Sequence, residues 1–144
     1  MKLLRTQSGI TLIEILVVLA IMALLATLVT TRVTERLAEA KVSTAKTQIK
    51  TFQQALELYK ADNDEYPTTE QGLDALINKP GVGNIPENYP PDGYLTKKKI
   101  PTDPWNRAYI YISEDGQKYT IITHGSDKKE GGTGTGADIS SDDL

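Results

Sequence analysis

The sequence contains no cysteine and only one histidine, one tryptophan and one phenylalanine. Without cysteine the folded part cannot be held by disulfides, so a hydrophobic core, a metal ion or neighbouring molecules must stabilise it. A single histidine and no thiol also argue against a transition-metal site and against catalysis. We therefore interpret His124 as a strand-end residue with a local hydrogen bond, and we predict that the chain is not an enzyme.

Basic residues are fewer than acidic ones, 16 against 19. The net charge is -3 over 144 residues, and two of the cations, Lys2 and Arg5, precede the first apolar segment. Proteins that bind DNA or RNA neutralise phosphates with Lys and Arg side chains. The composition therefore argues against nucleic acid as a partner, and the length leaves room for one modest domain.

A long apolar run begins at Ile10 and continues to Thr31, interrupted only by Glu14. About 20 apolar residues span a bilayer as a helix, and positive charge before the run predicts a cytoplasmic N-terminal end. A secretory signal would have a shorter apolar region followed by a small-residue cleavage site, whereas the small residues here lie within the run. We therefore predict cleavage before the apolar segment and a membrane-spanning helix over residues 10–31.

Glu14 is costly in this setting, because inserting a carboxylate into hydrocarbon costs about 2.5 kcal/mol or more. If the chain is cut after Gly9, the new amine of Ile10 is too awkwardly placed to satisfy Glu14 within the same helix. The amine of a neighbouring copy is one possible partner. A simpler interpretation stays open, in which Glu14 lies near the lipid headgroups and the segment is a plain signal anchor.

These residues resemble the start of the type IV pilins and pseudopilins, whose leaders end in Gly before a mature segment of the form F-T-L-x-E. The matching residues are Gly9, Ile10, Thr11, Leu12, Ile13 and Glu14. The resemblance implies that a prepilin peptidase cuts between Gly9 and Ile10 and methylates the new amine, and that Glu14 pairs with this amine during assembly. Two positions depart from the family pattern, because Ile10 replaces Phe and Thr31 replaces a helix-kinking Pro. No kink is predicted at Thr31.

Helical periodicity continues beyond the apolar run, and neither Gly nor Pro interrupts residues 10–61. Apolar residues recur at steps of three and four and form one stripe: Val42, Ala45, Ile49, Phe52, Leu56 and Tyr59. A coiled coil would show such a stripe too, but fewer than three clean heptads favour packing on the chain's own domain. We predict a helix of about 50 residues that ends at residues 62–64.

After this helix the pattern changes to short elements. A capping-box pattern at Thr68 and Gln71 predicts a short second helix, and the Pro-, Gly- and Asn-rich residues 79–104 predict a long loop. Two strand-like segments, residues 109–112 and 119–122, flank a tight turn and predict a β-hairpin. We therefore predict the α+β class, in which a small antiparallel sheet lies on the long helix and a C-terminal loop follows.

The terminal segment, residues 125–144, has few apolar side chains but many oxygen donors on a glycine-rich backbone. Its carboxylates are Asp127, Glu130, Asp138, Asp142 and Asp143. Calcium takes roughly six to eight oxygen ligands from carboxylates and carbonyls, so the composition is compatible with a calcium site, although the spacing is not that of an EF-hand. A disordered acidic tail is the alternative that composition leaves open.

Three further segments resemble the G-type pseudopilins of bacterial type II secretion: YPTTEQGLDALINKP, NYPPDGYL and PTDPWNRAYIY. The resemblance implies a type IV pilin-like fold. It also implies calcium binding in the terminal segment, through an Asp after Gly-x and an acidic pair just before Ile. Asp127 and Asp138 match these positions, whereas Ala137 replaces the first acid of the pair. Glu130, a backbone carbonyl or a water would have to supply the missing ligand.

The resemblance also implies an organisation and a location. We predict a leader of residues 1–9, a transmembrane and assembly helix of residues 10–31, and a periplasmic domain of residues 32–144. The chain would thus be a single-pass inner-membrane protein. The expected function is that of a structural subunit of a periplasmic filament, which helps move folded exoproteins through the outer-membrane secretin.

Expected partners are further copies of the chain, minor pseudopilins, the inner-membrane assembly platform and the prepilin peptidase, with no nucleic acid. The alternative function is that of a subunit of a surface or DNA-uptake pilus. A DNA-binding pilin should carry a basic stripe with aromatic residues, whereas the exported part of this chain is acidic. An exported enzyme on a signal anchor would lack a catalytic site and would leave Glu14 unexplained.

Overall fold

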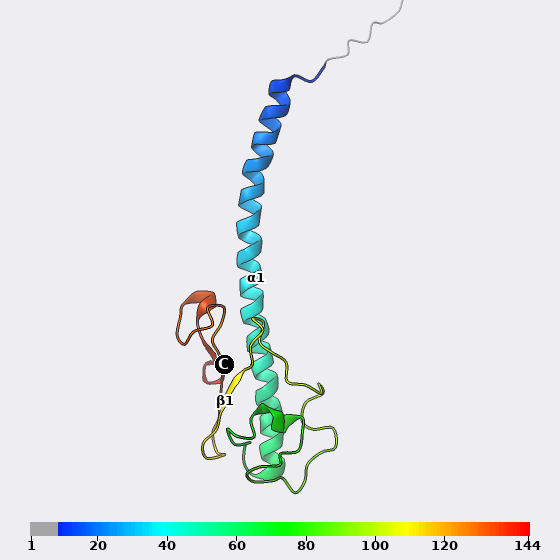
Figure 1. Cartoon of the computed structure of the whole chain (residues 1–144), viewed down its shortest axis with the longest axis vertical. Coiled ribbons are helices and arrows are strands. Elements are labelled where there is room, and N and C mark those ends of the chain that lie inside the picture. Colours follow the sequence, from blue (N-terminus) through cyan, green and yellow to red (C-terminus); the bar gives the residue numbers. More distant parts are fainter. Residues whose placement is uncertain (1–8) are drawn as a thin grey trace, which may run out of the picture. The chain divides into compact units, whose positions relative to one another are not determined.

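The computed structural model describes residues 9–144, apart from the side chains of residues 27–32. The leader residues 1–8, with Lys2 and Arg5, and the side chain of Thr31 therefore lie outside the described residues. The chain divides into two compact units, Met1–Leu37 and Ala38–Leu144. Helix α1 (Leu12–Asn63) runs through the boundary between them (Figure 1).

Helix α1 is 52 residues long. It begins after Thr11, whose carbonyl and hydroxyl oxygens accept hydrogen bonds from the Glu14 N–H at 3.1 and 3.3 Å. It ends where the N–H of Asp64 bonds to the Lys60 carbonyl and Asp64 adopts a φ of 66°, the left-handed conformation that commonly closes a helix. The predicted length and end of the helix are both confirmed.

In the first unit, the large aliphatic side chains of α1 are exposed. From Leu12 to Leu25 their exposed fractions range from 48% to 83%, and they occur at nearly every position of the helix. Within the described residues, no helix combines the length and the apolar character that crossing a bilayer requires. The predicted span of residues 10–31 includes residues 27–31, whose side chains the structure does not describe, so the span stays a prediction.

In the second unit, one face of α1 carries the hydrophobic core. The predicted stripe is buried from Ala45 to Tyr59, and Val42 is partly buried against the same cluster. The rings of Phe52 and Tyr109 meet edge to face with centroids 5.2 Å apart. Packing of the stripe on the chain's own domain is therefore confirmed.

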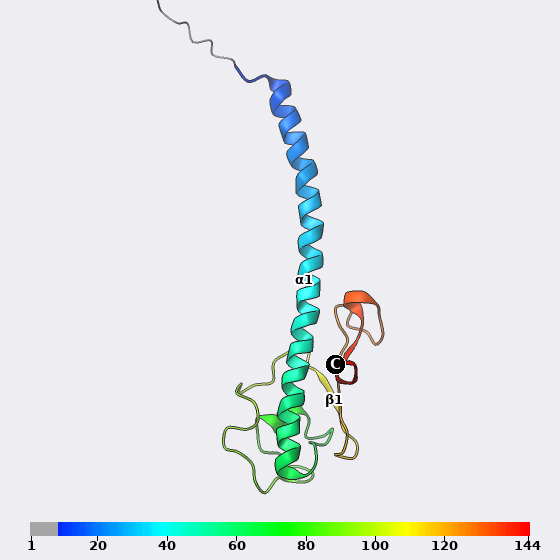
Figure 2. The ribbon, with the colours of Figure 1, turned by 180° about the vertical axis from the view of Figure 1, so that it is seen from behind.

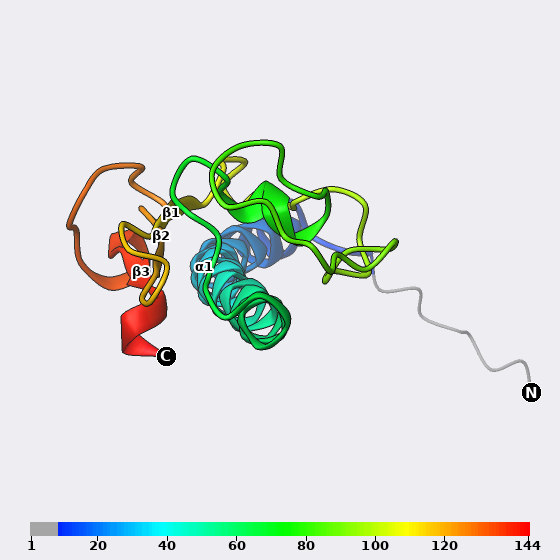
Figure 3. The same cartoon turned by 90° about the horizontal axis from the view of Figure 1, so that it is seen from below.

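Three short strands form an antiparallel sheet on one side of α1, in the order β1 (Ile110–Ile112), β2 (Thr120–Thr123) and β3 (Ile139–Ser140) (Figure 3). Tyr111 pairs with Ile121, and both side chains are buried. Thr123 pairs with Ile139 in the second ladder. The predicted hairpin is confirmed. The third strand was not predicted, because two residues are too few to show an alternating pattern.

The segment that follows α1 contains the predicted capping box. Thr68 and Gln71 bond each other in both directions, as a capping box should, with the Thr68 N–H at 2.9 Å from Gln71 Oε1 and the Gln71 N–H at 3.3 Å from Thr68 Oγ1. A single 3₁₀ turn follows, η1 (Leu73–Leu76), so the predicted short second helix is present as a 3₁₀ helix of four residues. Pro80 has no N–H to offer the Leu76 carbonyl, so a helix cannot continue there, and this carbonyl accepts from the N–H of Tyr94 at 2.7 Å.

Residues 79–104 form a long loop around the end of α1, as predicted (Figure 2). Tyrosine side chains attach this loop to the core. The Tyr89 hydroxyl donates to the Ala75 carbonyl at 3.0 Å, and the Tyr94 ring lies 5.2 Å from that of Tyr59. Because aromatic rings bury a large area, a loop with little regular structure can still be held in place.

Replacing Leu56 by alanine should lower the free energy of unfolding of the second unit by about 2 to 5 kcal/mol, the usual cost of a buried Leu-to-Ala cavity. Leu56 is 0% exposed. The matched control is Leu58→Ala on the same helix, because Leu58 is 59% exposed and its truncation should change stability by less than about 0.5 kcal/mol. Denaturant unfolding in detergent would measure both, and equal losses would contradict this packing.

Candidate functional site

The residues predicted to form the cleavage site lie just before α1. Gly9 and Ile10 are exposed and belong to no helix or strand. A Cβ added to Gly9 would meet no atom within 4 Å. The backbone around this peptide bond is therefore free of packing constraints in the described part of the chain.

Glu14 lies in the first turn of α1, where the helix dipole favours a negative charge. Its N–H is capped by Thr11. Sequence reasoning missed this cap, although the Thr-x-x-Glu spacing is the signal that indicates one. Among the described residues, the carboxylate of Glu14 forms no hydrogen bond or ion pair, and the side chain is exposed.

The terminal loop, residues 125–138, leaves the end of β2 and returns as β3. Gly125 makes this possible, because its φ is 60° and an added Cβ would lie 2.6 Å from the Ala137 carbonyl oxygen. Across the loop, the N–H of Ser126 donates to the Thr135 carbonyl at 3.2 Å. The loop then leads into Ile139, which is buried at 7% exposure. It is thus anchored at both ends by the sheet.

Asp127 is held by the glycine-rich backbone of this loop. Its Oδ1 accepts from the N–H of Lys129 at 3.0 Å. Its Oδ2 faces Gly132, where an added Cβ would lie 2.6 Å from this oxygen and would overlap the Gly136 carbonyl oxygen. Two hard oxygen donors, one carboxylate and one carbonyl, therefore converge beside Gly132.

Asp138 contacts Gly131, the residue before Gly132. Its Oδ2 accepts from the Gly131 N–H at 2.9 Å, and its Oδ1 lies 3.1 Å from Nδ1 of His124. The hydrogen bond from Gly131, and then the interaction with His124, lower the pKa of Asp138 below its usual value. His124 follows the last residue of β2, so its predicted place at a strand end is confirmed, whereas its hydrogen bond is not local, because it joins Asp138 14 residues further on.

The third predicted ligand, Glu130, is exposed, and no hydrogen bond or ion pair joins it to either aspartate in the described residues. Within that part of the chain, no three Asp, Glu, His or Cys side chains come together as a metal site. Asp127, Asp138 and the Gly136 carbonyl nevertheless fit the oxygen chemistry of calcium. The ion would have to complete its ligand set with backbone carbonyls, hydroxyls or water.

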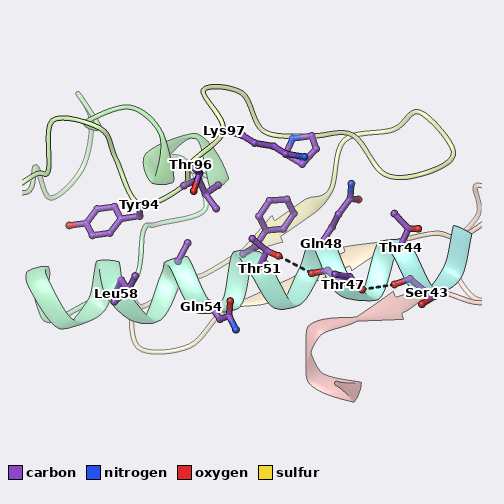
Figure 4. A pocket seen from close by; sticks show the side chains of 14 residues that line it. Ser43, Thr44, Thr47, Gln48, Thr51, Gln54, Leu58, Tyr94, Thr96 and Lys97 are labelled. Atoms are coloured by element: carbon purple, nitrogen blue, oxygen red, sulfur yellow. Dashed lines mark hydrogen bonds between the residues drawn. The ribbon is translucent and has the colours of Figure 1, made fainter. Parts of the chain in front are cut away.

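A separate groove of about 670 Å³ lies between α1 and residues 94–101 (Figure 4). Threonines line its α1 wall, and the hydroxyls of Thr44, Thr47 and Thr51 donate to carbonyls one turn back at 2.9 to 3.0 Å. The described residues that line this groove include no carboxylate, histidine or cysteine. Its polar lining consists of hydroxyls, amides and the amine of Lys97.

One contact of the terminal loop has no signal in the sequence. Nη1 of Arg107 donates to the carbonyl of Lys128 at 2.7 Å, across a separation of 21 residues. Side-chain to backbone contacts between distant segments leave no local pattern. This contact could be found only from the folded structure.

Two protein-family models match the chain. The model of the type II secretion system (T2SS), protein G, matches residues 32–142, and the model of the prokaryotic N-terminal methylation motif matches residues 4–30. The first match contains the sheet and the whole terminal loop. The second contains Gly9, Ile10 and Glu14.

Relatives match over nearly the full length. The type II secretion system core protein G of Pseudomonas aeruginosa is 48% identical over 137 residues, which cover 94% of each chain. The core protein G of Vibrio cholerae is 45% identical over 141 residues, which cover 96% of this chain and 94% of the relative.

A solved structure shares the architecture as well. The crystal structure of the major pseudopilin from the type 2 secretion system of enterohaemorrhagic Escherichia coli matches with a TM-score of 0.61 and 34% identity, covering 74% of this chain and 90% of that one. Both the sequence and the arrangement of a long helix with a small antiparallel sheet thus agree with the same group of proteins. The chain therefore belongs to the protein G family of the type II secretion system, the family of the major pseudopilins.

Proposed function

We propose that the chain is a structural subunit of the pseudopilus, a periplasmic filament of many copies that helps move folded proteins through the outer-membrane secretin. The observation that carries this proposal is the contrast within α1. In the second unit one face of the helix is covered by the chain's own core, whereas in the first unit apolar side chains are exposed at nearly every position. Such a surface needs a cover, which lipid supplies before assembly and neighbouring copies supply afterwards.

The test is a strain in which the gene is deleted and then supplied again. We expect the deletion strain to lose exoprotein secretion and to regain it when the gene is supplied again. DNA uptake should stay unchanged in both strains. Loss of DNA uptake with normal secretion would favour the alternative of a DNA-uptake pilus. The structure offers no specific observation for that alternative, and the chain's net charge of -3 argues against it.

In this proposal residues 1–9 are a leader, residues 10–31 cross the inner membrane once, and residues 32–144 lie in the periplasm. The methylation-motif match over residues 4–30 supports the leader. The exposed position of Gly9 and Ile10 supports access by a prepilin peptidase. The other partners that the proposal implies are further copies, minor pseudopilins, the assembly platform of the inner membrane and the secretin.

Replacing Gly9 by tryptophan should leave the leader attached, because the peptidase needs a small residue at the cut. Intact mass and N-terminal sequencing of the membrane protein would measure this, and wild type should begin with N-methylated Ile10. The matched control is Gly81→Trp, since an added Cβ meets nothing within 4 Å at either glycine, and this variant should be processed normally. A wild-type chain that starts at another residue would disprove the cleavage site.

We also propose that calcium binds in the terminal loop through Asp127 and Asp138, with the Gly136 carbonyl as a further ligand. Support comes from the convergence of Asp127 and Gly136 oxygens beside Gly132 and from the contact of Asp138 with the adjacent Gly131. A bound calcium ion would join two carboxylates of a loop that has little apolar area of its own. Glu130 is a ligand in this proposal only if its exposed side chain turns inward.

A further inference from the structure

The turn of residues 103–107 is a rigid anchor close to the terminal loop. Asp103 is only 3% exposed, and its Oδ1 accepts from the N–H groups of Trp105 at 3.0 Å and Arg107 at 2.8 Å. Backbone bonds close the same turn, from the Asp103 N–H to the Arg107 carbonyl and from the Asn106 N–H to the Asp103 carbonyl. Oδ2 of Asp103 accepts from the hydroxyl of Thr123, the last residue of β2. The turn is therefore fixed to the strand from which the terminal loop starts.

From this anchor the side chain of Arg107 reaches the terminal loop. Its Nη1 donates to the Lys128 carbonyl at 2.7 Å. Lys128 has a φ of 62°, a left-handed conformation that is costly for a residue with a Cβ and needs its surroundings to hold it. Lys128 directly follows Asp127, whose carboxylate accepts from the next N–H, that of Lys129. The left-handed turn at Lys128 is therefore followed directly by the N–H that bonds to the carboxylate of Asp127.

We propose that Arg107 is the positioning residue of the calcium loop, which holds the Lys128 carbonyl so that Asp127 is already in place before the ion binds. This inference rests on the calcium site proposed above. A preformed loop binds the ion more tightly, because its residues lose little conformational entropy when the ion binds. Since Ala137 supplies no carboxylate, the affinity for calcium depends all the more on how well the remaining ligands are positioned.

The charge of Arg107 acts in the opposite direction, because a guanidinium close to the site repels a calcium ion. Arg107 is exposed, so water and salt screen this repulsion. Three variants separate the two effects. Arg107→Gln removes the charge and keeps an N–H donor, Arg107→Ala removes both, and Arg107→Lys keeps the charge but loses the planar fork.

The experiment uses the full-length protein in detergent micelles, with two measurements. Calorimetric titration with calcium chloride should give a Kd about fivefold higher for Arg107→Ala, the size expected for one ordinary hydrogen bond at an exposed position. Amide hydrogen exchange of residues 126–131 in chelator should accelerate in the same variant. Exchange at the buried positions of α1 should stay unchanged, and the glutamine variant should lie between wild type and alanine in both measurements.

Unchanged exchange of residues 126–131 in Arg107→Ala would overturn the positioning role. Equal or tighter calcium binding by both the alanine and glutamine variants would overturn it as well. Charge repulsion would then outweigh the hydrogen bond from Arg107 to the Lys128 carbonyl, which we call the tether. If wild type takes up no calcium, the calcium site fails, and the exchange measurement in chelator decides the tether by itself. Faster exchange would support a tether that orders the loop without an ion, and unchanged exchange would refute it.

Discussion

Replacing Glu14 by leucine should abolish filament assembly, while membrane insertion stays at least as efficient as in wild type. The change removes a carboxylate that costs about 2.5 kcal/mol or more in hydrocarbon. It breaks no hydrogen bond or ion pair of the Glu14 side chain among the described residues, because the contacts with Thr11 are made by the N–H of Glu14. The defect should therefore arise from the missing pairing with the amine of another copy. Electron microscopy of filaments and extraction of membranes would measure the two effects.

Two control variants separate this pairing from a local effect on α1. Glu14 also stabilises the start of the helix through the dipole, by about 0.3 to 1 kcal/mol. Thr11→Ala should weaken the same helix start by about 1 kcal/mol while keeping the carboxylate, and it should still assemble. Glu14→Gln keeps the size, loses the charge and should fail to assemble. Wild-type numbers of filaments from Glu14→Leu would show that the amine pairing is wrong.

Calcium should raise the melting temperature of the full-length protein in detergent, relative to chelator. An ion that binds only the folded form adds stability of RT ln(1 + [L]/Kd), about 2.7 kcal/mol at a hundredfold excess over Kd. Magnesium should do much less, because it requires a stricter octahedron and keeps its waters. Because Ala137 supplies no ligand, the titration should extend to about 10⁻⁴ to 10⁻³ M, the range of weak extracellular sites. Identical melting across that range would refute the site.

Single substitutions test which carboxylates bind the ion. Asp127→Ala and Asp138→Ala should each remove most of the difference between calcium and chelator, and filament number and secretion should fall with it. The quantity to compare is the melting temperature in calcium minus that in chelator. Asp138→Ala also removes the contacts of Asp138 with Gly131 and His124, so it lowers the melting temperature even in chelator. Asp143→Ala removes the same charge from an exposed residue and should keep the full difference.

Glu130 is best tested by its own substitution. Its exposed side chain has no contact with Asp127 or Asp138 among the described residues. We therefore expect Glu130→Ala to change the calcium effect little. A loss as large as that of Asp127→Ala would mean that Glu130 turns inward and replaces the carboxylate missing at Ala137.

Features with a local cause were predictable from the order of residues alone. The helix over α1 follows from an unbroken stretch without Gly or Pro, and its buried face follows from the spacing of apolar residues such as Ile49, Phe52 and Leu56. The hairpin follows from two alternating segments around Asp115-Gly116. Each of these patterns repeats within a few residues, so neighbouring positions in the chain carry the whole signal.

Features that depend on contacts between distant segments were decided by the folded chain. The long loop returns to η1, where the carbonyl of Leu76 accepts from the N–H of Tyr94. Strand β3, the contact of Asp138 with His124 and the hydrogen bond from Arg107 to Lys128 likewise join residues 14 or more positions apart. Such pairings have no period in the sequence, since which groups meet is set by how the sheet, the turn and the terminal loop pack together.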